Sequence, residues 1–237
     1  MSCTNFKTPN TINLETCNES LKDCMTRVYK HMFLGLSLTG FIAYIVGTTP
    51  AVHQAIFGSY IKMAFVILAP FALLTLYSIK STTMRYTTAK SLFYTFSCAI
   101  GVLLSSIFLV YTNISIARAF FIAASMFGSM SLYGYVTKKD LTDIGSFLIM
   151  GVFGLMILFV INIFLDSTVM QTLISIAAIV MFLGLTAYDT QKIKQTYLKL
   201  EGEPEIVKKV AIHGALDLYL DIINIFIHLL HFIGEKD

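Results

Sequence analysis

The sequence predicts an all-α integral membrane protein built as a bundle of seven transmembrane helices. Of its 237 residues, 56% are hydrophobic and only 13% are charged, against roughly 25% charged residues in an ordinary soluble domain. The mean hydropathy is +0.75, and seven runs of mainly apolar residues approach the length of about 20 residues that a membrane-spanning helix needs. This composition excludes a soluble enzyme domain, a nucleic-acid-binding protein and a disordered regulator.

The order of the segments follows from the apolar runs. Residues 1–30 alternate polar and charged residues without the apolar core of a signal peptide, so we expect a retained N-terminal tail. A transmembrane domain over residues 31–234 follows, and residues 235–237 are expected as a C-terminal tail. The connections are short, so no separate soluble domain is expected. The expected spans are residues 31–49, 55–79, 91–111, 115–136, 144–165, 168–188 and 210–233.

The distribution of positive charge predicts an orientation. Fourteen of the 17 Lys and Arg residues fall in the tail and in the connections after the second, fourth and sixth spans. All of these segments lie on one side of a seven-span protein, and basic loops favour the cytoplasmic side. We therefore expect the N-terminus in the cytoplasm and the C-terminus on the opposite side. If the seventh segment did not cross fully, the C-terminus would return to the cytoplasm.

The last span carries a stripe of polar residues, although charges inside an apolar span cost roughly 2.5–3.5 kcal/mol each. At 100° per residue these positions fall within an arc of about 80° on one helix face and extend for about 27 Å. We expect this face to point into the bundle rather than toward lipid. The residues of the stripe are His213, Asp217, Asp221, Asn224, His228 and His231.

A further carboxylate, Asp189, directly follows the sixth apolar run. At the cytoplasmic end of that span it could meet a carboxylate of the seventh, because a linker of about 20 residues makes the two helices natural antiparallel neighbours. Two carboxylates in contact cannot comfortably both ionise, so they share a proton and titrate as a pair. Such a pair could act as a pH latch. Paired carboxylate oxygens also suit calcium, which could be held at Asp189 and Asp221.

Simpler interpretations stay open for each group. Asp189 could be a solvated residue at a helix end, Asp217 could form a structural ion pair, and His228 and His231 could face the membrane interface. A zinc site is disfavoured, since His213 lies too far along the helix from the other two histidines. The motifs HExxH, GxSxG and GxGD and a P-loop are absent from the sequence. We therefore expect neither enzymatic activity nor a cofactor.

Two segments resemble the last two spans of the Bax inhibitor-1 family, also called the transmembrane Bax inhibitor motif family. They are Gly184–Lys194 (GLTAYDTQKIK) and Gly214–Phe226 (GALDLYLDIINIF). The segments Tyr135–Leu141 (YVTKKDL) and Ser146–Gly151 (SFLIMG) are most similar to the bacterial branch. The resemblance extends from about Arg27 to Gly234 and is most specific in the last third of the chain.

The resemblance implies a seven-helix bundle with the last helix central and surrounded by the other six. It also implies a pH-sensitive calcium leak gated by carboxylates of the sixth and seventh helices. Asp189 matches the sixth-span aspartate, Asp221 the seventh-span one, and Asp217 an additional aspartate of some members. Some bacterial members carry an arginine late in the second span that contacts this pair. Here residues 72–80 contain only Lys80 as a distant substitute.

The first hypothesis is therefore a passive, proton-gated calcium-permeable channel in the lipid bilayer, with calcium and protons as its ligands. A bacterial inner membrane fits best, with an intracellular organelle as the alternative. A second hypothesis is an interaction protein that modulates a membrane protease or a cell-death factor, in which the aspartates only hold the fold together. A third is a proton-coupled transporter, which stoichiometric proton movement would distinguish from a leak.

Overall fold

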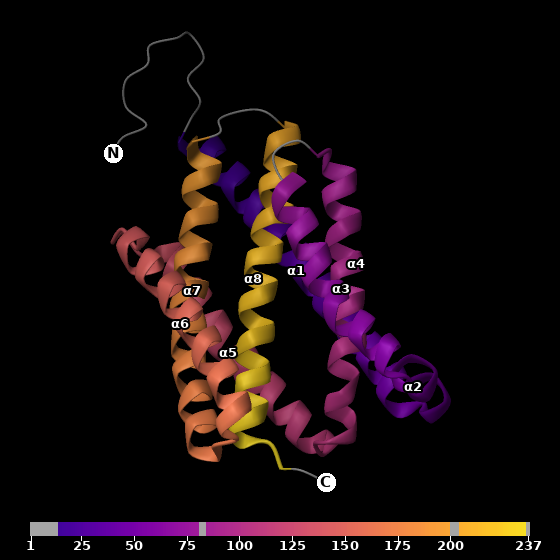
Figure 1. The fold of residues 1–237 in the computed structure, drawn as a ribbon. Helices are drawn as coiled ribbons and strands as arrows, with labels where there is room; N and C mark the ends of the chain where they lie inside the picture. Colours follow the sequence, from indigo (N-terminus) through magenta and orange to yellow (C-terminus); the bar gives the residue numbers. More distant parts are fainter. Residues whose placement is uncertain (1–13, 81–83, 200–203, 236–237) are drawn as a thin grey trace.

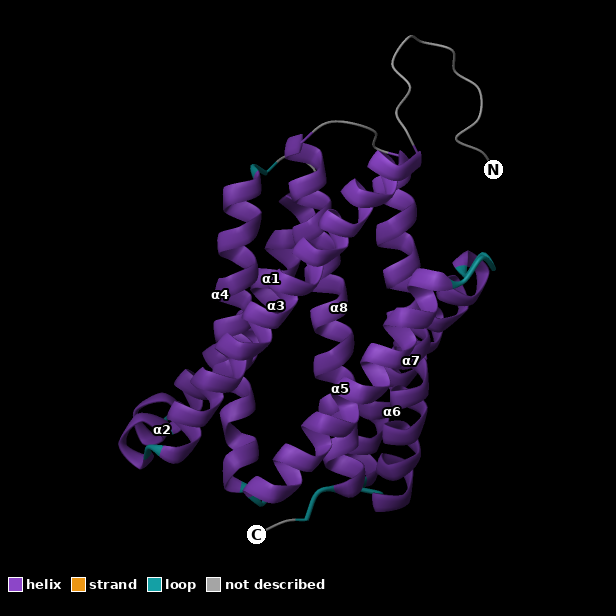
Figure 2. Cartoon of the chain, turned by 180° about the vertical axis from the view of Figure 1, so that it is seen from behind, coloured by secondary structure: helices purple, strands orange, loops and turns teal. Residues whose placement is uncertain are grey.

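The computed structural model describes residues 14–80, 84–199 and 204–235. Within these ranges every regular element is helical and no strand occurs (Figure 2). The elements are α1 (Leu14–Thr48), α2 (Pro50–Phe57), α3 (Tyr60–Lys80), α4 (Tyr86–Leu104), the 3₁₀ helix η1 (Ser105–Leu109), α5 (Asn113–Val136), α6 (Thr142–Leu165), α7 (Thr168–Lys199) and α8 (Pro204–Ile233).

Seven of these helices are long and apolar enough to cross a membrane, which confirms the predicted fold class. They are α1, α3, α4 with η1, α5, α6, α7 and α8. The first residues of α1 and the last residues of α8 lie at opposite ends of the bundle, as an odd number of crossings requires (Figure 1). The chain is therefore a multi-pass integral membrane protein.

The first helix begins at Leu14, well inside the segment expected as a tail, while residues 1–13 lie outside the described part. Its early turns bury an apolar stripe at the spacing of one helix face, and the charged residues between these positions are exposed. The expectation of a polar tail up to residue 30 rested on charge and missed this periodicity. The buried residues of the stripe are Leu21, Cys24, Met25, Val28 and Met32.

The expected second span, residues 55–79, is divided. The short helix α2 begins with Pro50 at its first position, where a missing N–H costs nothing. The spanning helix α3 starts only at Tyr60. In Figures 1 and 2 α2 lies at the edge of the bundle, far from α8.

The sixth span also differs from its expected range, because α7 does not end at residue 188 but continues to Lys199. Thr190, Gln191 and Ile193 are buried in this continuation, and no Gly or Pro interrupts it. Asp189 therefore lies inside a long helix rather than at its end. This register is what brings it opposite α8.

The last helix is the most deeply buried of the seven spans. Of its most apolar stretch 67% is buried, against 11–33% for the others. It packs against α1, α4, α5 and α7, and α3 reaches it through Tyr77, whose ring meets His213 edge-on at 5.0 Å. The resemblance implied that all six other helices surround it, but α6 packs only on α7 among the described elements.

Small residues allow α7 to approach its neighbours closely. A Cβ added to Gly134 of α5 would lie 2.2 Å from the carbonyl oxygen of Ala187, and one added to Gly145 of α6 would lie 2.3 Å from the Tyr188 ring. In contrast, Gly128 and Gly154 meet nothing within 4 Å. Gly134 and Gly145 therefore serve helix packing at their contacts with α7, which Gly128 and Gly154 do not make.

Candidate functional site

Three aspartates from two antiparallel helices form an acidic site. Asp189 comes from α7, and Asp217 and Asp221 come from successive turns of α8. The carboxylate of Asp189 lies within electrostatic range of Asp217 and of Asp221. The sequence predicted this meeting of the sixth and seventh spans, and the packing of α7 against α8 produces it.

A lysine that the sequence analysis did not assign to the site lies between two of these carboxylates. The Nζ atom of Lys192 is 3.6 Å from Oδ1 of Asp189 and 3.2 Å from Oδ2 of Asp217. The Lys192 side chain is half exposed, whereas that of Asp189 is only 13% exposed. Lys192 thus ties α7 to α8 by an ion triad at the border of the bundle. Such half-exposed pairs contribute little stability, since solvent screens them.

The spacing could have revealed Lys192, since it lies three residues after Asp189 on one helix face. That signal needs a helix that continues past residue 188, which the apolar run alone did not predict. The cation beside the aspartates therefore comes from α7, not from the end of α3. Lys80 ends α3 and is exposed.

Asp221 lies one turn deeper on α8 and is almost completely buried, with 3% of its surface exposed. Its Oδ2 atom has no hydrogen-bond partner among the described residues. The Thr186 hydroxyl, which donates to the Phe182 carbonyl at 2.8 Å, is also within hydrogen-bonding reach of this carboxylate. An ionised carboxylate in such surroundings is costly unless a partner compensates its charge. Among the three aspartates, Asp221 is therefore the one whose ionised form is most costly.

Three of the remaining stripe residues have described contacts with groups other than the aspartates. The Asn224 amide donates to the Leu220 carbonyl of its own helix at 2.8 Å. The Tyr111 hydroxyl pairs with Nδ1 of His231 at 3.2 Å, and His213 meets Tyr77. His228 is partly buried. The stripe residues described in electrostatic contact with Asp189 are Asp217 and Asp221.

The polar stripe of the last helix is only partly buried. Asp221 is the only stripe residue that is fully buried, while the other five are partly exposed. The apolar face opposite packs into the core, with Leu218, Tyr219 and Ile225 at 0% exposure. The polar stripe thus lies beside the most buried face of α8, and Asp221 is buried with that face.

Two hydrogen-bond networks hold the part of α7 that carries the acids. Ser131 of α5 links the hydroxyls of Tyr29 and Thr190, at 2.6 and 3.0 Å. The amide of Gln191 accepts from the Leu141 N–H at 2.9 Å and donates to the Lys139 carbonyl at 2.7 Å. Side chains directly after Asp189 therefore fix its helix against α1, α5 and the α5–α6 connection.

The aspartates do not form a ready-made metal site. Within the described residues, no group of three or more His, Cys, Asp or Glu side chains is arranged to hold a metal ion. In addition, Lys192 lies between Asp189 and Asp217, where its charge would repel a metal cation. Calcium at Asp189 and Asp221 stays a prediction.

The comparisons with known proteins agree with this architecture. Residues 21–237 match the family described as "Inhibitor of apoptosis-promoting Bax1". The chain is 40% identical to the protein RP147 of Rickettsia prowazekii over 222 residues, 94% of this chain and 93% of the relative. It is 38% identical to the inner membrane protein YbhL of Escherichia coli over 217 residues, 91% of this chain and 93% of the relative.

A protein of Borreliella burgdorferi is 39% identical over 212 residues, which cover 90% of this chain and 91% of the relative. The family match covers all seven spans, including the segments that carry the acidic site. The chain therefore belongs to the Bax inhibitor-1 family of multi-pass integral membrane proteins.

Proposed function

We propose that this protein is a pH-sensitive, calcium-permeable leak channel whose gate is the carboxylate group between α7 and α8. The observation that carries the proposal is Asp221, a buried carboxylate with one oxygen unpartnered among the described residues and two further aspartates in electrostatic range. A proton on this group relieves the cost of the buried charge and removes repulsion between the helices. Loss of the proton restores the repulsion and favours separation of α7 and α8.

Lys192 has a defined part in this mechanism. Its ammonium group compensates Asp189 and Asp217 and holds the outer end of the site closed. Its described hydrogen bond goes to Asp217 and not to Asp221, so in this proposal Asp221 is the group that responds to the local proton concentration. In the open state, carboxylate oxygens released from Lys192 are hard ligands of the kind that calcium prefers. Calcium is then the cargo of the pathway.

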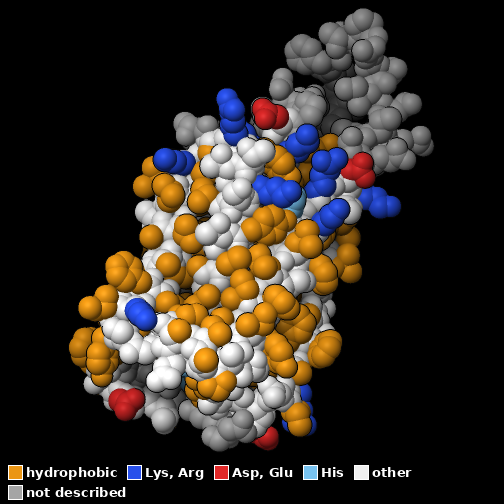
Figure 3. All heavy atoms as spheres, turned by 90° about the vertical axis from the view of Figure 1, so that its right-hand side faces the viewer, with side chains coloured by type: hydrophobic (Ala, Val, Ile, Leu, Met, Phe, Trp, Pro, Cys, Tyr) orange, Lys and Arg blue, Asp and Glu red, His pale blue; other side chains and the backbone are white. Residues whose placement is uncertain are grey.

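The proposed location is a bacterial inner membrane with the start of α1 in the cytoplasm. The relative YbhL is an inner membrane protein. The basic residues gather at the end of the bundle where α1 and α8 begin (Figure 3), and basic segments favour the cytoplasmic side. The gate would then respond to cytoplasmic pH.

The test is calcium flux from loaded proteoliposomes between pH 6 and pH 8. Asp221→Asn keeps the shape of the side chain but cannot ionise, so we expect a low flux that no longer rises with pH. Lys192→Met leaves Asp189 and Asp217 uncompensated, so we expect a several-fold higher flux than in the wild type. The two variants act in opposite directions, which a general loss of folding would not produce.

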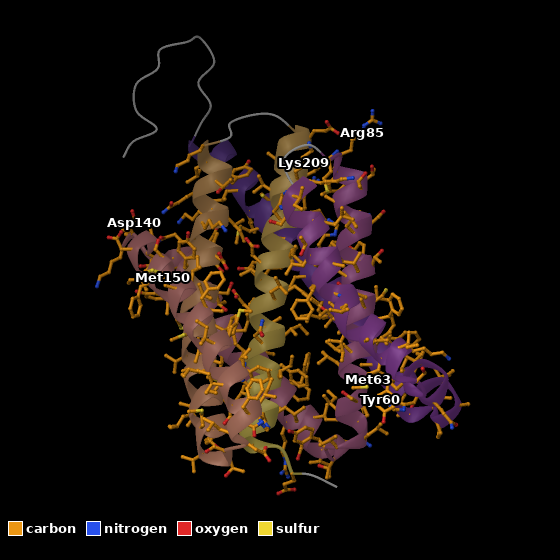
Figure 4. All side chains as sticks on the ribbon, viewed as in Figure 1. Tyr60, Met63, Arg85, Asp140, Met150 and Lys209 are labelled. Carbon is orange, nitrogen blue, oxygen red and sulfur yellow. The ribbon has the colours of Figure 1, made fainter. Side chains whose placement is uncertain are left out.

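The matched control is Asp140→Asn, which removes a carboxylate from the exposed α5–α6 connection, far from α8 in Figure 4. The Thr142 hydroxyl and N–H both donate to Asp140 and lower the pKa of its carboxyl. We expect wild-type flux and pH dependence from this variant. If folded Asp221→Asn protein leaks like the wild type, the channel proposal is wrong. Retained capture of one specific membrane protease by the variants lacking Asp189 and Asp221 would then favour an interaction protein.

A further inference from the structure

We infer that a basic pocket between α1, α4 and α8 binds the phosphate headgroup of an anionic phospholipid. The pocket has a volume of about 550 Å³ and lies at the end of the bundle where these three helices begin. Its walls carry Arg27 and Lys30 from α1, Lys90 from α4 and Lys208 from α8. This site is separate from the acidic site and does not depend on the channel proposal.

The pocket lining carries four cations and one carboxylate. Arg27, Lys30 and Lys90 all lie within electrostatic range of His31. Asp23 is the only acidic residue of the lining, and no salt bridge joins the four cations to a described carboxylate. Figure 3 shows several basic side chains gathered around a histidine at this end of the molecule. Like charges held together in this way favour an anion as their partner.

The floor of the pocket offers hydrogen-bonding groups for the oxygens of a phosphate. Nδ1 of His31 pairs with the Tyr94 hydroxyl at 2.8 Å, and Nε2 lies 3.3 Å from the Tyr86 hydroxyl. All three side chains are half-buried and line the pocket. Arg27 adds a planar guanidinium, which suits phosphate oxygens better than a point charge does. Cations and half-buried hydrogen-bonding groups thus lie together in one pocket, as a site for a phosphate headgroup requires.

The surroundings favour a lipid over a soluble phosphate. Leu34 of α1 lines the pocket and is 44% exposed, and the adjacent Phe33 is 67% exposed. Both belong to a membrane-spanning segment, so this side of the pocket opens on the face that contacts acyl chains. A phospholipid can place its phosphate among the cations and its chains along α1. Basic pockets between transmembrane helices on the cytoplasmic side commonly take such headgroups.

The test uses the fact that the chain contains no tryptophan. Leu34→Trp introduces a single tryptophan into the pocket of the full-length protein, and its fluorescence can be excited selectively. The protein is reconstituted in phosphatidylcholine vesicles that contain a minor fraction of brominated phosphatidylglycerol or brominated phosphatidylcholine. We expect stronger quenching by the anionic lipid at equal mole fraction. Phe147→Trp, on the exposed face of α6, should be quenched equally by both lipids.

The matched variants remove two positive charges each. Lys90→Ala with Lys208→Ala empties the pocket of two cations, and we expect the apparent affinity for the anionic lipid to fall on the order of tenfold. Arg85→Ala with Lys209→Ala removes two cations from the same end of the bundle, outside the pocket lining (Figure 4). This pair should keep the preference. Far-UV circular dichroism verifies that all variants are folded.

Three results would overturn the inference. Equal quenching of the Leu34→Trp protein by both lipids would show that the pocket holds no anionic headgroup. Equal loss of preference in the two double variants would assign the effect to general surface charge. Displacement of the brominated lipid by millimolar inorganic phosphate would assign the pocket to a soluble phosphate compound instead.

Discussion

The helices α6 and α8 show how differently two membrane spans of one protein can be used. The most apolar stretch of α6 has a hydropathy of 2.8 and is 11% buried, whereas that of α8 has 1.6 and is 67% buried. The more hydrophobic helix therefore lies outside and the more polar one inside. In a bilayer the solvent is itself apolar, so hydrophobicity gives no reason for burial, while polar groups gain from leaving lipid.

The largest difference between the two helices is expected for truncated leucines. Leu218 of α8 has 0% exposure and Leu165 of α6 is 59% exposed. Leu218→Ala leaves a cavity in the core and should destabilise the protein by about 2–5 kcal/mol. Leu165→Ala should stay within about 0.5 kcal/mol of the wild type, because lipid fills the space. Unfolding in detergent mixtures, followed by circular dichroism, measures both. Equal losses would contradict the assignment of α6 to the lipid boundary.

An intermediate effect is expected from two glycines. Gly134→Ala places a methyl group against the Ala187 carbonyl of α7, and such overpacking costs about 1–3 kcal/mol. Gly154→Ala on α6 meets nothing within 4 Å, so its better helix propensity should stabilise the protein by up to about 1 kcal/mol. Opposite shifts of the thermal midpoint would support the difference between packed and lipid-facing glycines. A stable Gly134→Ala protein would show that α5 and α7 can separate without cost.

The smallest effect concerns a single hydroxyl in the core. Tyr219 of α8 has a hydroxyl 2.7 Å from that of Thr39 on α1, and Tyr219→Phe should cost about 1 kcal/mol. The control is Tyr133→Phe on α5, where the side chain is 48% exposed. A double-mutant cycle with Thr39→Ala isolates the bond, because the second substitution should then cost less. Independent losses would mean that the hydroxyls do not interact.

The sequence predicted the spans well and their ends less well. A membrane span is a long local signal, so seven apolar runs were enough to identify seven helices. The first and sixth spans, α1 and α7, extend beyond their apolar runs, since both helices continue through charged segments. In α1 the charges alternate with buried residues such as Val28, and in α7 Gln191 gains partners from the α5–α6 connection. Charge alone therefore placed the start of α1 too late and the end of α7 too early.

The candidate site was predictable in its acids but not in its cation. Asp217 and Asp221 lie one helical turn apart in an apolar span, and Asp189 directly follows another apolar run. Because a charge inside a membrane span costs free energy, these residues can be identified from the sequence as candidates for a site. In the sequence, Lys192 falls in the connection expected after residue 188. Only the continuation of α7 to Lys199 places it beside the acids. The basic pocket was not predicted at all, because Lys30, Lys90 and Lys208 are far apart in the chain and become neighbours only through packing.

The amino-acid pattern by itself determined a seven-helix membrane protein with acids on its last two spans, because hydropathy and helical spacing are properties of neighbouring residues. Only the tertiary structure decided which helix the bundle buries, which aspartate loses contact with water and which cations share a pocket. These features depend on how closely small residues let particular helices approach. No local pattern encodes that distance, so it emerges only when all the helices are assembled.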